Sequence, residues 1–300
     1  MNESSSLYDP RTTPEDAGQD ERLIDRFPVR LFEGSCQHAL SIIHLNQRYM
    51  AQLVNSQQGE AAGELRQSLE DIQTAAARLD RDVTQMLCLL RCLQHSEKPR
   101  WELIDLCAFV QDLCLPRKML SEALGVRLSL SCAGVRELYV QADRQYLTYI
   151  CLALLSNALR ACTPGGGKVT IALRQGDGAA LLSITDNGCG LPGDSLRSME
   201  ENQDHFLGTS HSSLLLCREY CRLTGWTLEL HDRPRGRGAE AVLTIPFRQA
   251  DPFCPPLRSH SPDEPVRNAR SLWFAMAFEF AALPGLESAD FSMPPALREI

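Results

Sequence analysis

The sequence predicts an α+β fold in which a long helical hairpin precedes a two-layer α/β sandwich, and three observations lead to this fold class. Apolar residues recur in alternating steps of four and three through residues 65–93, which is typical of a helix that packs along a seam. Alternating apolar segments surround the turn "QGDG" and again the turn "RPRGRG", which predicts two β-hairpins. Apolar helical segments lie between these strands along the chain, and this order is typical of helices layered on a sheet.

Composition restricts the class of protein. The chain has 300 residues, of which 44% are hydrophobic, and a formal net charge of -8. An acidic chain without a long basic run does not bind nucleic acid through bulk charge. No apolar segment reaches the roughly 18 residues that span a bilayer, and the polar, acidic N-terminus is unlike a signal peptide. We therefore expect a soluble, cytoplasmic protein with no membrane span and no nucleic-acid partner.

The twelve cysteines suit a reducing compartment. None forms a C-x-x-C pair, and the two C-x-x-x-C pairs, Cys88 with Cys92 and Cys217 with Cys221, lie in apolar helical segments. We expect core thiols there rather than a metal site.

The chain divides into four segments. We expect a disordered N-terminus over residues 1–27, a helical hairpin over 28–98 and an α/β sandwich over 99–248. Residues 249–300 are rich in proline and form a tail that contains one apolar segment, "SLWFAMAFEFAAL". This segment is a candidate docking helix, either on this protein or on another.

The hairpin has a longer apolar seam than a lone hairpin usually buries. In its first helix, about residues 31–56, Gln47 interrupts a row of apolar residues. We predict that two hairpins pair into a dimeric four-helix bundle; the alternative is a hairpin that packs on its own chain. The row in the second helix consists of Leu65, Leu69, Ile72, Ala76, Leu79, Val83, Met86, Leu90 and Leu93.

Two polar features stand out in the sandwich. Asn157 lies in the apolar helix predicted over residues 143–162, within "LLSNALRACTPGGGKVTIAL". Asparagine has a poor helix propensity, and a buried amide costs stability unless it is paired. A strand then ends in "ITDNGCGLP", where Asp186 precedes Gly188 and Gly190 in a turn. Glycine allows such a turn to bend and a ligand to approach the backbone closely.

Together these features resemble the ATP-binding domain shared by sensor histidine kinases, Hsp90, type II topoisomerases and MutL. "LLSNALRACTPGGGKVTIAL" resembles the kinase N box, and "DNGCGLP" resembles the G1 box. The resemblance covers about residues 101–247. The preceding hairpin resembles the dimerisation and phosphotransfer domain of histidine kinases.

The resemblance implies a role for each matching residue, with ATP and Mg²⁺ as cofactors. Asn157 would bind Mg²⁺ through its side-chain oxygen, and Arg160 would lie near the phosphates. Asp186 would accept a hydrogen bond from the adenine amino group, while Gly188 and Gly190 would line the adenine pocket. The alternatives are a helix-packing amide for Asn157, a solvated charge for Arg160 and a turn or cap residue for Asp186.

The sequence departs from the family pattern in the N box and in the lid. Ala153 occupies the position, one helical turn before the asparagine, where the family usually has a polar residue. In the lid, "GTSHSSLLLCREYCRLTGW", only Gly208 is retained, and His211 and Ser213 stand where the family has glycines. Gly208, Ser212 and Ser213 remain candidates for phosphate contact, because hydroxyls and free N–H groups at a helix start bind anions.

The phospho-acceptor segment also departs from the pattern. The candidates are His38 and His44 in "QHALSIIHLNQRYM", and neither is followed by the acidic residue of the family motif, since Ala39 and Leu45 occupy those positions. His38 is the first choice because it lies on a polar stripe of its helix. The alternative is that both are solvated surface residues.

These inferences predict a histidine kinase, active as a homodimer. The implied reaction transfers the γ-phosphoryl group of ATP to a histidine and then to an aspartate of a response regulator receiver domain. The runner-up is a catalytically degenerate nucleotide-binding or scaffold protein, which the lid and the histidine segment favour. A third possibility is a serine kinase or partner switch on the same fold, for which the hairpin is unnecessary.

Overall fold

The computed structural model describes most of the chain beyond its N-terminus. The expectation of disorder over residues 1–27 and the lid positions Gly208 and His211 lie outside the described residues. The described residues are 29–55, 60–94, 96–132, 134–163, 165–191, 212–233, 236–247, 264–281, 283, 285–286, 291–294 and 297.

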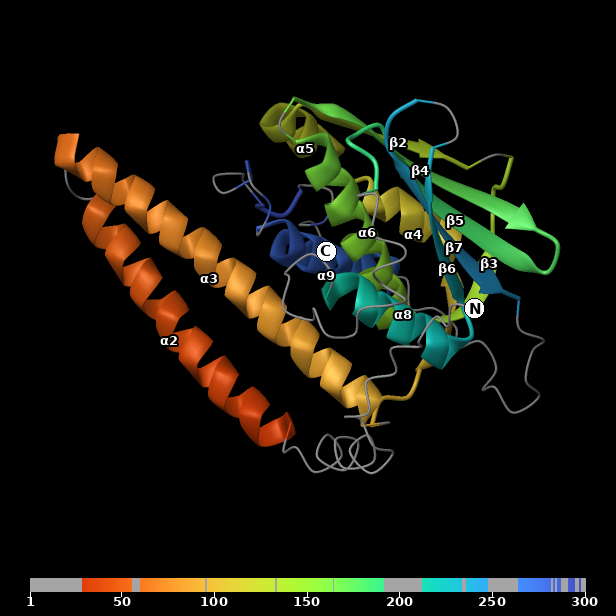
Figure 1. Ribbon diagram of the computed structural model, residues 1–300, viewed down its shortest axis with the longest axis horizontal. Helices are drawn as coiled ribbons and strands as arrows, with labels where there is room; N and C mark the ends of the chain where they lie inside the picture. Colours follow the sequence, from red (N-terminus) through yellow and green to blue (C-terminus); the bar gives the residue numbers. More distant parts are fainter. Residues whose placement is uncertain are drawn as a thin grey trace, which may run out of the picture.

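The N-terminal part is an antiparallel hairpin of two long helices, α2 (Val29–Asn55) and α3 (Glu60–Leu93) (Figure 1). Gln47, which interrupts the apolar row, is buried between them, and its side-chain nitrogen donates a hydrogen bond to the Ile72 carbonyl at 3.2 Å. This bond satisfies the buried amide.

The apolar row of α3 is split between two environments. Leu69 and Ala76 are buried in the hairpin, whereas Leu65, Ile72 and Leu79 are 46–50% exposed. On α2, the large exposed apolar residues are Ile42, Ile43, Leu45, Tyr49, Met50 and Leu53. One hairpin therefore buries only part of its seam.

The sandwich contains a mixed five-stranded sheet and a two-stranded sheet (Figure 1). In the larger sheet, the first pair is parallel and the other pairs are antiparallel. Its strand order is β2 (Val126–Ser131), β4 (Gly167–Gly176), β5 (Ala179–Asp186), β7 (Ala239–Pro246) and β6 (Thr227–Asp232). The smaller sheet pairs β1 (Trp101–Asp105) with β3 (Tyr139–Asp143) antiparallel.

Helices cover the face of the larger sheet that is turned toward the hairpin (Figure 1). The central helix, α6 (Arg144–Cys162), begins after Asp143, whose carboxylate caps the helix by accepting the Tyr146 N–H at 3.0 Å. Its middle is buried nearly all round because it packs between the sheet and further helices. These helices are α4 (Leu106–Leu113), α5 (Arg117–Leu124), α6 (Arg144–Cys162) and α8 (Ser212–Thr224).

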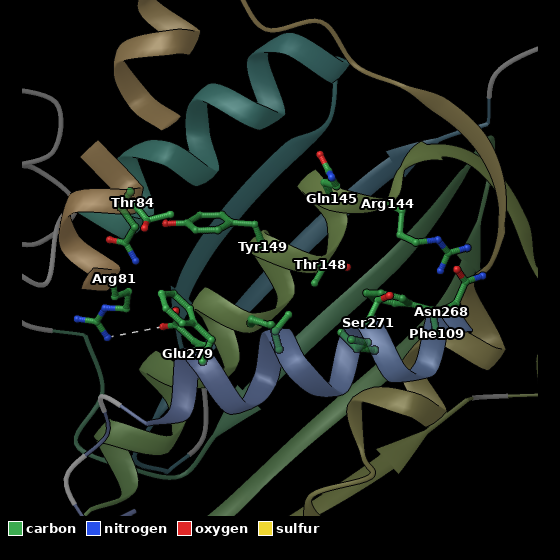
Figure 2. Close-up of a pocket in the computed structure, with 15 residues that line it drawn as sticks. Arg81, Thr84, Phe109, Arg144, Gln145, Thr148, Tyr149, Asn268, Ser271 and Glu279 are labelled. Atoms are coloured by element: carbon green, nitrogen blue, oxygen red, sulfur yellow. Dashed lines mark ion pairs between the residues drawn. The ribbon is translucent and has the colours of Figure 1, made fainter. Parts of the chain in front are cut away.

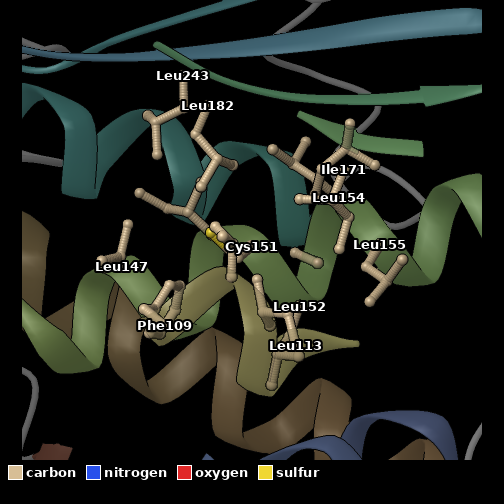
Figure 3. Packing of buried hydrophobic residues seen from close by; sticks show 14 of the residues in the cluster. Phe109, Leu113, Leu147, Cys151, Leu152, Leu154, Leu155, Ile171, Leu182 and Leu243 are labelled. Atoms are coloured by element: carbon tan, nitrogen blue, oxygen red, sulfur yellow. The ribbon is translucent and has the colours of Figure 1, made fainter. Parts of the chain in front are cut away.

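The core lies between α6 and the sheet (Figure 3). Leu147 and Cys151 of α6 are fully buried, as are Leu182 of β5 and Leu243 of β7. Such burial contributes about 1.5–3 kcal/mol per large apolar side chain.

The C-x-x-x-C cysteines behave as core thiols. Cys92, Cys217 and Cys221 are buried, and burial raises the pKa of Cys92 to about 12. Among the described residues no group of three or more His, Cys, Asp or Glu side chains could hold a metal ion. No helix in the described part of the chain is both long and apolar enough to cross a bilayer.

The apolar segment of the tail folds onto this same chain as α9 (Glu264–Phe280). It packs on α6, α4 and α3, and Trp273, Met276 and Phe280 are buried in that contact. The Trp273 ring nitrogen donates a hydrogen bond to the Phe291 carbonyl at 3.2 Å. Of the two docking alternatives, the structure supports the one on this protein.

Two adjacent aromatic residues test the contribution of this docking to stability. Trp273 is 5% exposed and Phe274 is 62% exposed. Trp273→Ala should lower the free energy of unfolding by about 3–5 kcal/mol, while Phe274→Ala should change it by less than about 0.5 kcal/mol. Urea denaturation of both variants measures the difference. Equal losses would contradict the docking of α9.

Candidate functional site

The candidate site lies where the end of β5 meets the C-terminal half of α6. The turn that follows β5 packs on α6, where the Cys189 N–H donates to the Ala161 carbonyl at 3.3 Å. Ala161 lies one helical turn after Asn157, so both residues are on the same side of α6. The structure therefore brings the Asp186 turn to the part of α6 that carries Asn157.

The Asp186 carboxylate has a different environment at each oxygen. The residue is 5% exposed, and its Oδ1 accepts the Gly188 N–H at 2.8 Å and the Ala239 N–H at 3.3 Å. Among the described residues, Oδ2 has no hydrogen-bond partner. Asp186 is thus a turn residue through one oxygen, and the other oxygen remains available to a ligand.

Asn157 is half-buried, in contrast to its neighbours Ser156 and Ala158, which are buried. Within the described part of the chain, its amide makes no hydrogen bond. The amide oxygen is a hard ligand of the kind that Mg²⁺ prefers.

Two glycines of the turn are required by its geometry. A Cβ at Gly188 would overlap the Ala161 carbonyl, so no other residue allows this contact with α6. Gly190 has φ +84°, which is the left-handed region that favours glycine.

Two side chains that sequence reasoning missed hold the turn in place. Asn187 Oδ1 accepts the Lys168 N–H at the start of β4 at 2.6 Å, and Asp232 Oδ1 accepts the Leu191 N–H at 3.0 Å. The turn is therefore fixed to β4, α6 and β6. No signal within "DNGCGLP" indicates the contact with Asp232, because that residue lies 41 positions later in the chain.

Arg160 lies in a different environment from Asp186, among residues of α3 and α9. Burial lowers the pKa of its guanidinium; the charge of Arg81 of α3 acts in the same direction, and the charge of Glu279 of α9 opposes it. Its Nε is buried without a hydrogen-bond partner among the described residues. The structure thus brings Arg160 to the junction of α3, α6 and α9.

The remaining candidates belong to other parts of the molecule. Ser212 and Ser213 are the first two residues of α8, directly after the undescribed lid. His38 is exposed and His44 half-buried on α2, and neither has a hydrogen-bond or ionic partner among the described residues. Because α3 lies between α2 and the sandwich (Figure 1), the structure does not bring these histidines to Asp186.

The comparisons with known proteins agree with this architecture. Residues 142–249 match the family model described as histidine kinase-, DNA gyrase B-, and HSP90-like ATPase. The sensor protein EvgS of Escherichia coli is 29% identical over 50% of this chain and 13% of its own length. The alginate biosynthesis sensor protein KinB of Pseudomonas aeruginosa is 31% identical over 51% of this chain and 25% of its own. The chain therefore corresponds to a quarter or less of the length of these two relatives.

The solved structures show the same fold. Full-length ShkA in complex with AMPPNP aligns with 89% of this chain and 54% of its own, with a TM-score of 0.57 and 19% identity. The resemblance to sensor histidine kinases and the predicted fold class, a helical hairpin followed by a histidine kinase-like ATPase sandwich, are confirmed.

Proposed function

We propose that this chain is a histidine kinase-like signalling protein that binds ATP with Mg²⁺ and transfers the γ-phosphoryl group to a histidine of its hairpin. From there the group passes to an aspartate of a response regulator. The observation that carries the proposal is the Asp186 carboxylate, which has one oxygen saturated by backbone N–H groups and the other available beside a glycine turn.

Asp186 would recognise the adenine amino group. A carboxylate is an acceptor-only group, so it pairs with an exocyclic amine. Its two backbone hydrogen bonds orient the carboxylate before a ligand arrives, which reduces the entropy cost of binding. Gly188 and Gly190 would line the adenine pocket, and the relative crystallised with AMPPNP agrees with an ATP site in this fold.

Asn157 would hold Mg²⁺ through its side-chain oxygen. The amide suits the ion because it is half-buried and has no hydrogen bond among the described residues. The bound ion would supply positive charge that offsets the charge of the phosphates. The chain itself would contribute the backbone N–H groups and hydroxyls of Ser212 and Ser213, with Gly208 in the lid.

Arg160 would contact the phosphates only after a change in its surroundings. Its guanidinium is buried at the junction of α3, α6 and α9, so it would have to leave this junction to reach a nucleotide.

The exposed apolar residues of the hairpin support a homodimer. Large apolar side chains of α2 and α3 are exposed along the helices, and a contiguous exposed apolar patch marks an interaction surface. A second hairpin would cover it in a four-helix bundle. Free thiols throughout the described cysteines support a reducing, cytoplasmic setting.

A degenerate kinase that acts as a nucleotide-binding scaffold is the second candidate. Three departures favour it: Ser213 at a lid position where the family has glycine, Ala153 in α6, and the absence of an acidic residue after His38. An imidazole nucleophile needs a partner to fix its tautomer, and His38 has none among the described residues.

One variant of the carboxylate tests adenine recognition. Asp186→Asn should preserve the turn, because the amide oxygen still accepts the Gly188 and Ala239 N–H groups. It should weaken ATP binding about tenfold to hundredfold, because a donor replaces the oxygen that meets the adenine amino group. Calorimetry with Mg-ATP measures this, with the exposed turn variant Asp177→Asn as control. Failure of the unmodified protein to bind Mg-ATP at millimolar concentration would refute the nucleotide site.

Charges placed in the apolar row of α3 test the dimer. Replacing Leu79 and Met86 together by lysine puts two like charges into each seam and should give monomers. Gln73→Lys, which adds a charge on an exposed position outside the row, should leave the dimer intact. Sedimentation velocity at micromolar concentration distinguishes them, and a monomeric unmodified protein would overturn the dimer.

Labelling of histidine variants identifies the acceptor. With γ-labelled ATP and Mg²⁺, the protein should acquire acid-labile, base-stable label that His38→Ala abolishes and His44→Ala retains. Ala39→Glu should raise the labelling rate about tenfold, because it supplies the missing carboxylate.

Label that survives loss of both histidines would refute the histidine assignment. If no variant is labelled although ATP binds, the scaffold candidate is correct.

A further inference from the structure

Exposed basic side chains gather along β2 and β4, at one edge of the larger sheet. A hollow of about 640 Å³ at this edge is lined by four cations and one acid. A second hollow, of about 570 Å³, is lined by two cations and one acid. We call the cations of the two hollows the basic stripe. They are Arg117, Lys118, Arg127, Arg136, Lys168 and Arg174.

The two strands bring three of these cations to one face of the sheet. Lys168 and Arg174 of β4 are six positions apart, so they lie on the same face, with about 20 Å between their backbones. Arg127 of β2 is the register partner of Lys168 and shares that face. The residues next to them in sequence, Leu128 and Val169, are buried in the core on the other face.

The cations of the basic stripe are accessible and mostly unpaired. All six are exposed. Lys118 forms an ion pair with Glu122 at 3.8 Å, which contributes little because both side chains are exposed. Among the described residues, the other five cations have no side-chain hydrogen bond and no ion pair.

The arginines that line the cavity between α3, α6 and α9 differ in this respect (Figure 2). Arg81 contacts Glu279 at 3.7 Å, and Arg144 contacts Glu102 at 2.6 Å. Those charges are balanced within the chain, whereas the charges of the basic stripe are left to solvent or to a partner.

The register of β2 and β4 also places like charges side by side. Arg127 and Lys168 are neighbours on adjacent strands, about 5 Å apart at the backbone. Like charges at such positions repel each other and lower stability. The whole chain has a net charge of -8, so this positive surface also differs in sign from the rest of the molecule. A local arrangement that opposes stability and is relieved by an anion indicates an interaction surface.

The dimensions of the basic stripe favour an extended peptide segment. A small anion cannot span the two hollows. Between them the side chains are small, namely Ser129, Thr170 and Ala172, so an extended backbone can approach the sheet closely. Alternate side chains of an extended segment share one face and recur about every 7 Å. About seven residues with acids at alternate positions therefore match the stripe.

Single-stranded nucleic acid, the other extended anion, fits less well. Proteins that bind it provide aromatic side chains on which the bases stack. Among the described residues, no aromatic side chain lines either hollow. The net negative charge of the chain also opposes a long polyanion.

We propose that the basic stripe binds an acidic, extended segment of a partner protein. Carboxylates at alternate positions of that segment would meet Arg127 and Lys168 at one end and Arg174 at the other. The surface is independent of the nucleotide proposal, since neither Asn157 nor Asp186 lines either hollow.

The probe for the test is a fluorescein-labelled nonapeptide of alternating glutamate and threonine. Fluorescence anisotropy measures its binding to the full chain, beside a control peptide with glutamine at every glutamate position. The glutamate peptide should bind about tenfold more tightly than the control peptide, because only it carries charges for the stripe. Binding should weaken strongly at about 0.5 M salt, which screens exposed charges.

Two double variants with the same change in net charge show where the peptide binds. Arg127→Gln with Lys168→Gln removes two cations of the basic stripe and should weaken binding about fivefold to tenfold. Arg218→Gln with Arg267→Gln removes two exposed cations of α8 and α9 and should leave binding unchanged. Thermal unfolding is the check on folding for both variants.

Absence of binding to the unmodified protein, or equal affinity for the glutamine peptide, would overturn the proposal. Equal losses in the two double variants would overturn it as well, because they would show that only the total charge matters. Tighter binding of a single-stranded oligothymidine with the same number of charges would assign the surface to nucleic acid instead of a peptide. Nucleotide binding can fail or succeed without changing any of these results.

Discussion

One carboxylate oxygen, Oδ1 of Asp186, holds the turn after β5 to the first residue of β7, because it accepts N–H groups from both. Because Asp186 is only 5% exposed, these two bonds are necessary, since an unpaired buried carboxylate is costly. Gly238 allows the close approach: a Cβ there would overlap the Asp186 carbonyl. The glycine turn, its contact with α6 and the direction of Oδ2 all depend on this anchoring.

The elements of the candidate site were predictable because their signals are local. Asn157 has a poor helix propensity although it lies within a helix, and the Asp-Asn-Gly turn follows a strand of alternating apolar residues. The anchors Asn187 and Asp232 were not predicted as such, because their partners lie 19 and 41 residues away. Arg160 likewise carries no local sign that its charged neighbours would come from α3 and α9. Contacts of this range are set by how elements pack, which periodicity does not specify.

The junction of α3, α6 and α9 concentrates buried charge in an otherwise apolar contact. Burial raises the pKa of the Glu279 carboxyl, while Arg81 and the Ser156 hydroxyl act in the opposite direction. Removing one member of such a group leaves the other charge buried and unpaired, which costs more than the pair contributes. The pairing of these buried charges therefore restricts which surfaces of α3, α6 and α9 can pack together. The burial of the apolar residues of α9 supplies the free energy of that packing.

The same junction constrains the proposed phosphoryl transfer. Transfer requires the acceptor nitrogen in line with the γ-phosphate at near-contact distance, yet α3 lies between α2 and the sandwich of one chain (Figure 1). Separating the sandwich from α3 within a chain would expose Trp273, Met276 and Phe280 wherever α9 lost its contacts. Each of these side chains contributes about 1.5–3 kcal/mol when buried. In the proposed dimer, a histidine presented by the hairpin of a second chain would avoid that cost.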